Sequence, residues 1–160
     1  MVSQTKESAT SSPIKLVGVV IALVAALLVT FFITRPAAIT TSFTPLSGLM
    51  TLKAMAADAM PYDIAISSPT PTLIEFYADW CTTCQGMSST MVDLHQQYSD
   101  RINFVMLDID DPQWAAQVSK YGASGVPQFT LLDAYHDEVK TWVGKVPKPI
   151  LANVFDQLLG

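Results

Sequence analysis

The two cysteines of the chain, Cys81 and Cys84, are separated by two residues and directly follow Trp80. A zinc site would use both thiolates but normally needs four ligands, and the only histidines, His95 and His136, stand at no finger-like spacing. A purely structural disulfide would close a very short loop and add little loop-closure entropy. The third use of such a pair is thiol–disulfide exchange, which the spacing favours.

Exchange chemistry assigns a different role to each cysteine. If a strand ends and a helix begins at the motif, Cys81 lies at the helix N-terminus, where free N–H groups and the helix dipole stabilise its thiolate. Cys84, one turn later, lies deeper and resolves the mixed disulfide that Cys81 forms. Cys81 is therefore expected to be exposed and Cys84 shielded. The electrons reside in the sulfurs, so we expect neither a cofactor nor a metal.

The elements around the motif predict an α/β fold. One of the helices has clear start and stop signals: Asp111 as a cap, Pro112 in the first turn and Gly122 at the end. The order of the predicted strands and helices begins with a parallel βαβ unit and ends with a hairpin and a helix. This order gives a mixed sheet flanked by helices. The predicted strands are 72–78, 102–109, 128–134 and 138–144, and the predicted helices run from the cysteines to about 99, over 110–122 and over 148–159.

The N-terminal part predicts a membrane anchor. Residues 16–33 are uncharged and apolar, long enough as a helix to cross the hydrocarbon core, with Lys15 and Arg35 at the two ends. A cleaved signal peptide is the alternative, but the apolar run is longer than usual and the nearest Ala-x-Ala site, Ala54–Ala56, is far downstream. We expect a disordered tail at 1–13, a transmembrane anchor at 14–35, a linker at 36–46 and a domain at 47–160.

The first helix of that domain is expected to be capped by Ser47, and residues 61–71 either extend it or form a turn.

Lys6 and Lys15 precede the apolar run, which slightly favours a cytoplasmic N-terminus and a domain on the other side. The formal net charge is −5 and a basic stripe is absent, so nucleic acid is not an expected partner. The lipid bilayer is an expected partner, through the membrane anchor.

Three acidic residues, Asp108, Asp110 and Asp111, lie at the end of the second predicted strand and just after it. They could form a cation site. A strand end followed by a helix cap explains them better, because Asp is strongly favoured at caps.

Several motifs together resemble the thioredoxin family over about residues 70–160. They are Trp80-Cys81-x-x-Cys84, the Gly-Val-Pro at 125–127 and Gly144 after the last strand. The resemblance implies a thioredoxin fold in which Pro127 is cis, faces the cysteines and, with Val126, presents backbone to an extended substrate segment. It also implies that Trp80 shields the cysteines and forms part of the substrate surface.

With its apolar N-terminal segment, the chain looks most similar to membrane-anchored TxlA-type thioredoxin-like proteins of cyanobacteria and thylakoids. That resemblance implies a protein-disulfide oxidoreductase in the thylakoid lumen or periplasm, which takes electrons from a membrane thiol carrier and reduces target proteins, including those of cytochrome maturation. One alternative is a dedicated cytochrome c thioreductase, although the segment between Cys84 and Pro127 is too short for the insertion typical of that group. The other is a non-catalytic binding module that uses the fold as a scaffold.

The resemblance also places Glu75 at the position of the family's buried carboxylate. Burial in the strand would raise its pKa, and it could then move the proton of Cys84. The alternative is a solvated glutamate on an edge strand, because charged residues are seldom buried without a partner. Departures from the family are Met106 for the lysine that accompanies the acid, Ser89 for the proline of the active-site helix, and Thr82-Thr83 for Gly-Pro.

Overall fold

The computed structural model describes residue 21, residues 23–27 and residues 45–160. Ile21 and residues 23–27 are helical. Within these described stretches, no helix is both long and apolar enough to cross a membrane. The predicted tail at 1–13, most of the anchor predicted at 14–35 and the linker up to position 44 lie outside the described residues.

The centre of the folded part is a four-stranded mixed sheet in the order β2-β1-β3-β4. β1 runs parallel to β2 and antiparallel to β3, and β3 forms a hairpin with β4. This topology confirms the predicted mixed sheet. The strands are β1 (Thr72–Tyr77), β2 (Asn103–Asp108), β3 (Gln128–Leu132) and β4 (Glu138–Val143).

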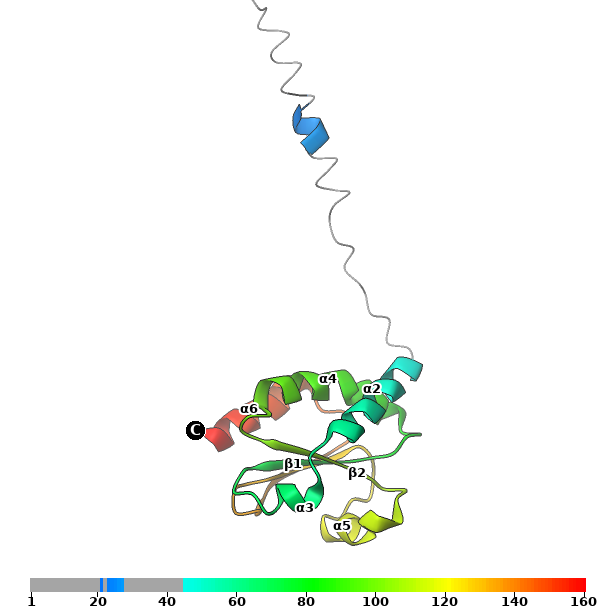
Figure 1. Ribbon diagram of the computed structural model, residues 1–160, viewed down its shortest axis with the longest axis vertical. Coiled ribbons are helices and arrows are strands. Elements are labelled where there is room, and N and C mark those ends of the chain that lie inside the picture. The colour runs from blue at the N-terminus through cyan, green and yellow to red at the C-terminus, as the bar shows by residue number, and fades with distance from the viewer. Residues whose placement is uncertain (1–20, 22, 28–44) are drawn as a thin grey trace, which may run out of the picture. The chain divides into compact units, whose positions relative to one another are not determined.

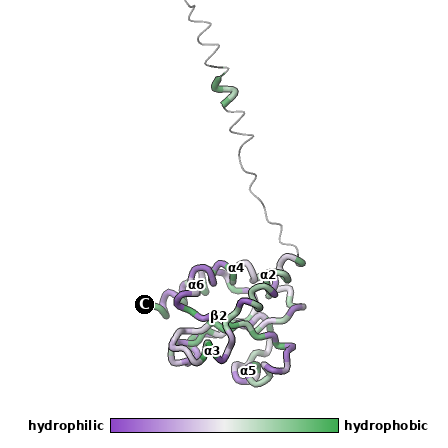
Figure 2. The backbone as a smooth tube through the Cα atoms, viewed as in Figure 1, coloured by the Kyte–Doolittle hydropathy of each residue, from purple (hydrophilic) through white to green (hydrophobic). Residues whose placement is uncertain are grey.

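Helices cover both faces of this sheet, as Figure 1 shows, with α2, α4 and α6 on one side and α3 and α5 on the other. The bounds are α2 (Pro45–Asp58), α3 (Tyr62–Ala65), α4 (Thr82–Tyr98), α5 (Ala115–Lys120) and α6 (Lys148–Leu159). In the hydropathy view (Figure 2) the tube near the β2 label is largely green. β1 and β3 are buried along their whole length because helices cover both faces of the sheet, whereas β4 at its edge is largely exposed.

Three details differ from the sequence prediction. α2 begins at Pro45, a residue that suits the first turn of a helix, so Ser47 lies inside the helix rather than capping it. Residues 61–71 contain the short helix α3 and turns. The helix predicted at 110–122 is divided at Trp114, because its first turn after Asp111 is a 3-10 turn, η1 (Pro112–Trp114).

Helix α2 packs closely on α4 at one end and is tied to the sheet at the other. A Cβ atom added to Gly48 would lie 2.8 Å from the Gln85 carbonyl oxygen, so only glycine allows the two backbones to approach this closely. Beyond the far end of α2, the Met60 N–H donates to the Phe104 carbonyl of β2, with an N···O distance of 2.9 Å. These contacts hold α2 over the sheet beside the cysteine motif.

Candidate redox site

The candidate site lies where β1 leads into α4. Cys81 and Cys84 form a disulfide with an S–S distance of 2.16 Å. Cys81 is the N-cap residue of α4, and its Sγ accepts the N–H of Cys84 at an N···S distance of 3.0 Å. The predicted strand-to-helix transition at the motif is therefore confirmed, and the first cysteine lies at the positive end of the helix dipole.

The two cysteines differ less in solvent exposure than the sequence predicted. Cys84 is fully buried, as expected for a residue inside the first turn, but Cys81 is only 4% exposed. Both pack in one apolar cluster with Leu52 of α2 and with Tyr77 and Ala78 at the end of β1. The expectation of an openly exposed Cys81 is wrong for the disulfide form, because these neighbours enclose both sulfurs.

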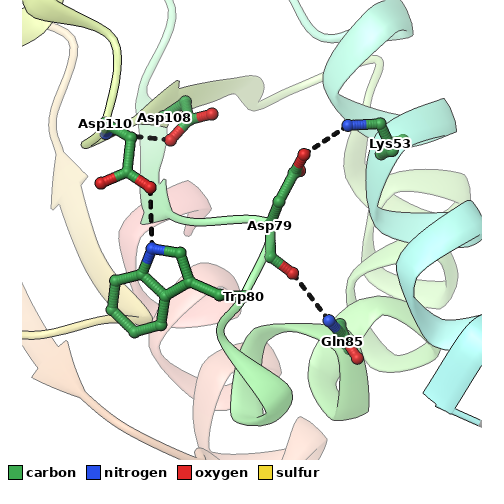
Figure 3. A network of polar contacts seen from close by, with 6 residues as sticks. All are labelled: Lys53, Asp79, Trp80, Gln85, Asp108 and Asp110. Carbon is green, nitrogen blue, oxygen red and sulfur yellow. Dashed lines mark hydrogen bonds and ion pairs between the residues drawn. The ribbon is translucent and has the colours of Figure 1, made fainter.

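Trp80 is 64% exposed and lies at the surface beside the disulfide. Its indole N–H donates to a carboxylate oxygen of Asp110 at 2.7 Å, and the Asp110 N–H donates to Asp108 at 3.0 Å (Figure 3). The indole is thus oriented from the end of β2 and leaves much of its ring area open.

A second polar chain on the other side of the loop involves Asp79, which sequence reasoning missed (Figure 3). The Asp79 carboxylate forms an ion pair with Lys53 of α2, and its backbone carbonyl accepts the Gln85 side-chain amide at 2.7 Å. These contacts connect the loop before the cysteines to both α2 and α4. No local motif predicts them, because Lys53 and Asp79 are far apart in the sequence.

The Val126–Pro127 peptide bond is cis, as the resemblance implied. Val126 packs against the cluster that contains both cysteines, so this turn lies beside the disulfide. The Gly144 N–H donates to the Pro127 carbonyl at 2.8 Å, and Gly144 has a positive φ of 84°. A glycine suits that conformation. Its hydrogen bond joins the end of β4 to the cis-proline loop.

Glu75 lies in the middle of β1 between β2 and β3, and it is only 2% exposed. Neither of its carboxylate oxygens has a hydrogen-bond partner among the described residues. Burial without a compensating charge raises the pKa of Glu75 to about 8. The alternative of a solvated edge-strand glutamate is therefore wrong, because β1 is an inner strand.

Within the described part of the chain, no group of His, Cys, Asp and Glu is arranged to hold a metal ion. The acidic residues at the end of β2 and just after it have structural partners instead. Asp111 caps η1 by accepting the Gln113 N–H, and Asp108 accepts the Asp110 N–H. The cap interpretation of this acidic segment is thus confirmed.

Comparison with known proteins agrees with this geometry. The Thioredoxin family profile matches residues 53–157. The chain is 42% identical over 113 residues to the thiol:disulfide interchange protein TxlA of Synechococcus elongatus, covering 71% of this chain and 59% of that protein. It is 43% identical over 101 residues to the chloroplastic thioredoxin-like protein HCF164 of rice, covering 63% of this chain and 38% of that protein.

A Synechocystis homologue of TxlA is 36% identical over 126 residues, covering 79% of this chain and 70% of that protein. Among solved structures, a thioredoxin variant from Halobacterium salinarum superposes with a TM-score of 0.53 at 27% identity, covering 62% of this chain and 86% of the other. The profile match spans most of the folded part, including the cysteine pair and the cis-proline. The chain therefore has a thioredoxin fold and belongs to the thioredoxin family.

Proposed function

We propose that the chain is a membrane-anchored thiol–disulfide oxidoreductase that reduces disulfides of target proteins in the thylakoid lumen or periplasm. The observation that carries the proposal is the Cys81–Cys84 disulfide at the start of α4, beside the cis-Pro127 turn. The relatives support it: one of them is named as a thiol:disulfide interchange protein, and another as a chloroplastic thioredoxin-like protein.

In the proposed reaction the reduced protein attacks first through Cys81. Its thiolate forms a bond to one sulfur of the target disulfide, and the other target sulfur leaves as a thiolate. The Cys84 thiolate then attacks the Cys81 sulfur, which releases the second target thiolate and forms the disulfide found in the structure. Two electrons pass to the target, and a dithiol donor must reduce the disulfide again.

The position of Cys81 explains why it would be the attacking group. As N-cap residue it lies at the helix end where N–H groups lack intrahelical partners, and its sulfur accepts one of them. Cys84 is buried inside the first turn and reaches the Cys81 sulfur without a change of fold. The exposed indole of Trp80, the backbone of Val126 and cis-Pro127 would then hold the extended target segment.

We assign the proton transfer to Glu75. A carboxyl group with a pKa of about 8 exchanges its proton near neutral pH, and in its ionised form either oxygen of Glu75 can accept one, because neither has a hydrogen-bond partner among the described residues. Met106 packs against the apolar cluster around the cysteines and pairs with Glu75 across β1 and β2. Loss of the Cys84 proton to this carboxylate would generate the resolving thiolate.

The proposed location rests on the apolar segment at 16–33 and on the relatives. The segment would cross the bilayer, with the N-terminus in the cytoplasm and the folded part on the lumenal or periplasmic side. A membrane thiol carrier would supply the electrons, and maturing cytochromes are proposed among the targets.

A direct test uses the full chain, reduced with dithiothreitol and freed of it, mixed with a protein that contains one accessible disulfide. We expect one target disulfide to be reduced per protein, with re-formation of the Cys81–Cys84 disulfide. The matched control is the double variant Cys81→Ser, Cys84→Ser, which should reduce none. If this variant retains the biological role of the wild type, the chain is a binding module rather than an oxidoreductase.

A further inference from the structure

A groove lies between α2 and α4, on the side of the sheet that these two helices cover. The two helices touch at Gly48 and Gln85, and further along they border a cavity of about 240 Å³. Its walls include Met55 of α2, Met91 of α4 and Phe104 of β2. The groove is therefore lined largely by apolar side chains, as binding sites for small molecules usually are.

The Glu75 side chain lines this same groove, and it is almost completely buried there. Both of its oxygens lack a hydrogen-bond partner among the described residues. Leaving such a group unsatisfied costs free energy, so a ligand that supplies donors would recover it. An unpartnered carboxyl group at the base of an apolar groove is the feature that a ligand would recognise.

The charges of the lining residues select the chemistry of that ligand. They include Asp58 and Glu75 but no lysine or arginine, and His95 is the only other ionisable residue among them. An anionic ligand would face two carboxyl groups and no fixed cation. A neutral alcohol offers a single donor, whereas an ammonium group carries three donors and can serve both oxygens of the ionised carboxylate.

We propose that the groove between α2 and α4 binds a small apolar amine, whose ammonium group pairs with the Glu75 carboxylate. The hydrocarbon part packs against Met55, Met91 and Phe104. Binding to the protonated carboxyl releases that proton to solvent and leaves an ammonium–carboxylate pair. The site is separate from the exposed face around Trp80, and the proposal goes beyond the exchange reaction.

The test titrates the oxidised full chain, in detergent micelles and an amine-free buffer, with benzylamine and with benzyl alcohol. Selective ¹³C labelling of glutamate carboxyls reports on Glu75 directly. We expect benzylamine to bind at least about tenfold more tightly than the alcohol, because hydrogen bonds between charged groups are stronger than those between neutral groups. The amine should also shift the titration midpoint of Glu75 to lower pH, and its affinity should rise between pH 6 and 8.

Two variants separate the carboxyl group from the groove. Glu75→Gln keeps the rim residues Asp58 and His95, so any pH dependence from them remains, but the preference for the amine should vanish. Ala54→Phe, on the exposed rim, should weaken both ligands by filling the groove. An amine that binds no better than the alcohol, or a Glu75 resonance that stays unchanged in wild type, would overturn the proposal.

This experiment needs no redox partner and no target disulfide. A chain that binds the amine but fails to reduce targets would therefore contradict the proposed function alone. A chain that reduces targets but ignores the amine would contradict this inference alone.

Discussion

At the scale of single residues, Glu75 is the most unusual feature of the molecule. An ionised carboxylate without partners is costly in an apolar interior. Burial therefore raises the pKa of Glu75 to about 8, and the folded protein keeps the group protonated up to about that pH. Glu75 lies on the inner strand β1 and pairs with Met106 of β2, which packs against the cysteine cluster. Its position points to a role in proton transfer rather than in stability.

We expect Glu75→Gln to slow disulfide exchange at neutral pH, by at most about 10²–10⁴-fold, the usual loss for an acid–base group. Glutamine keeps the size of the side chain but cannot carry the Cys84 proton. The measurement is the stopped-flow rate of target reduction by the reduced full chain. Thr72→Val, also buried on β1, is the matched control and should retain the wild-type rate. Equal rates for both variants and wild type would remove Glu75 from the mechanism.

The same residue makes stability depend on pH. In the unfolded chain Glu75 ionises near its usual pKa of 4.5, whereas in the folded chain it stays protonated up to about 8. The folded state therefore binds more protons between these values, and its contribution, complete below pH 4.5, falls by about 1.4 kcal/mol per pH unit as pH rises through that window.

Urea unfolding of oxidised wild type and Glu75→Gln at pH 5 and pH 8 measures this linkage. Wild type should lose stability relative to the variant between the two pH values. A constant difference would show that the carboxyl group is not buried and protonated in the folded protein.

At the scale of elements, α2 supports the redox site from outside the local motif. It contributes Leu52 to the cysteine cluster and Lys53 to the ion pair with Asp79. Its position depends on the close approach of Gly48 to α4. Any displacement of α2 would therefore be transmitted to the loop that precedes Trp80.

We expect Gly48→Ala to destabilise the protein by about 1–3 kcal/mol, the usual cost of overpacking, because the new methyl group would collide with the Gln85 carbonyl. Gly86→Ala is the matched control. It lies on α4 with open space around it and should stabilise the protein by about 0.5–1 kcal/mol. Denaturant unfolding of both variants checks the pair, and equal effects would mean that α2 does not cross α4 this closely.

The elements also show which parts of the structure the sequence could predict. Strands such as Thr72–Tyr77 are short, apolar and rich in strand formers, and Cys81 marks a helix start, so local patterns sufficed. The predicted start of α2 was wrong by three residues, because Pro45 and Ser47 both suit a helix N-terminus. The Lys53–Asp79 ion pair and the groove over Glu75 depend on tertiary packing, which no local pattern records.

At the scale of the whole molecule, the proposal requires the folded part to lie across the membrane from the cytoplasm. We expect protease added to intact, right-side-out vesicles to digest the folded part, because the basic residues Lys6 and Lys15 favour a cytoplasmic N-terminus. The digestion is followed with an antibody to the C-terminus. Protection in intact vesicles, with digestion only after lysis, would reverse the proposed orientation.

The division of labour between the two cysteines is the central claim, and trapping of targets tests it most directly. In Cys84→Ser the resolving thiolate is missing, so the full chain should accumulate stable mixed disulfides with its targets. In Cys81→Ser the group that attacks first is missing, and no mixed disulfide should form. Non-reducing electrophoresis of the two single variants expressed at equal levels gives the answer. Abundant adducts for Cys84→Ser and none for Cys81→Ser are predicted, whereas equal trapping by both variants would contradict the mechanism.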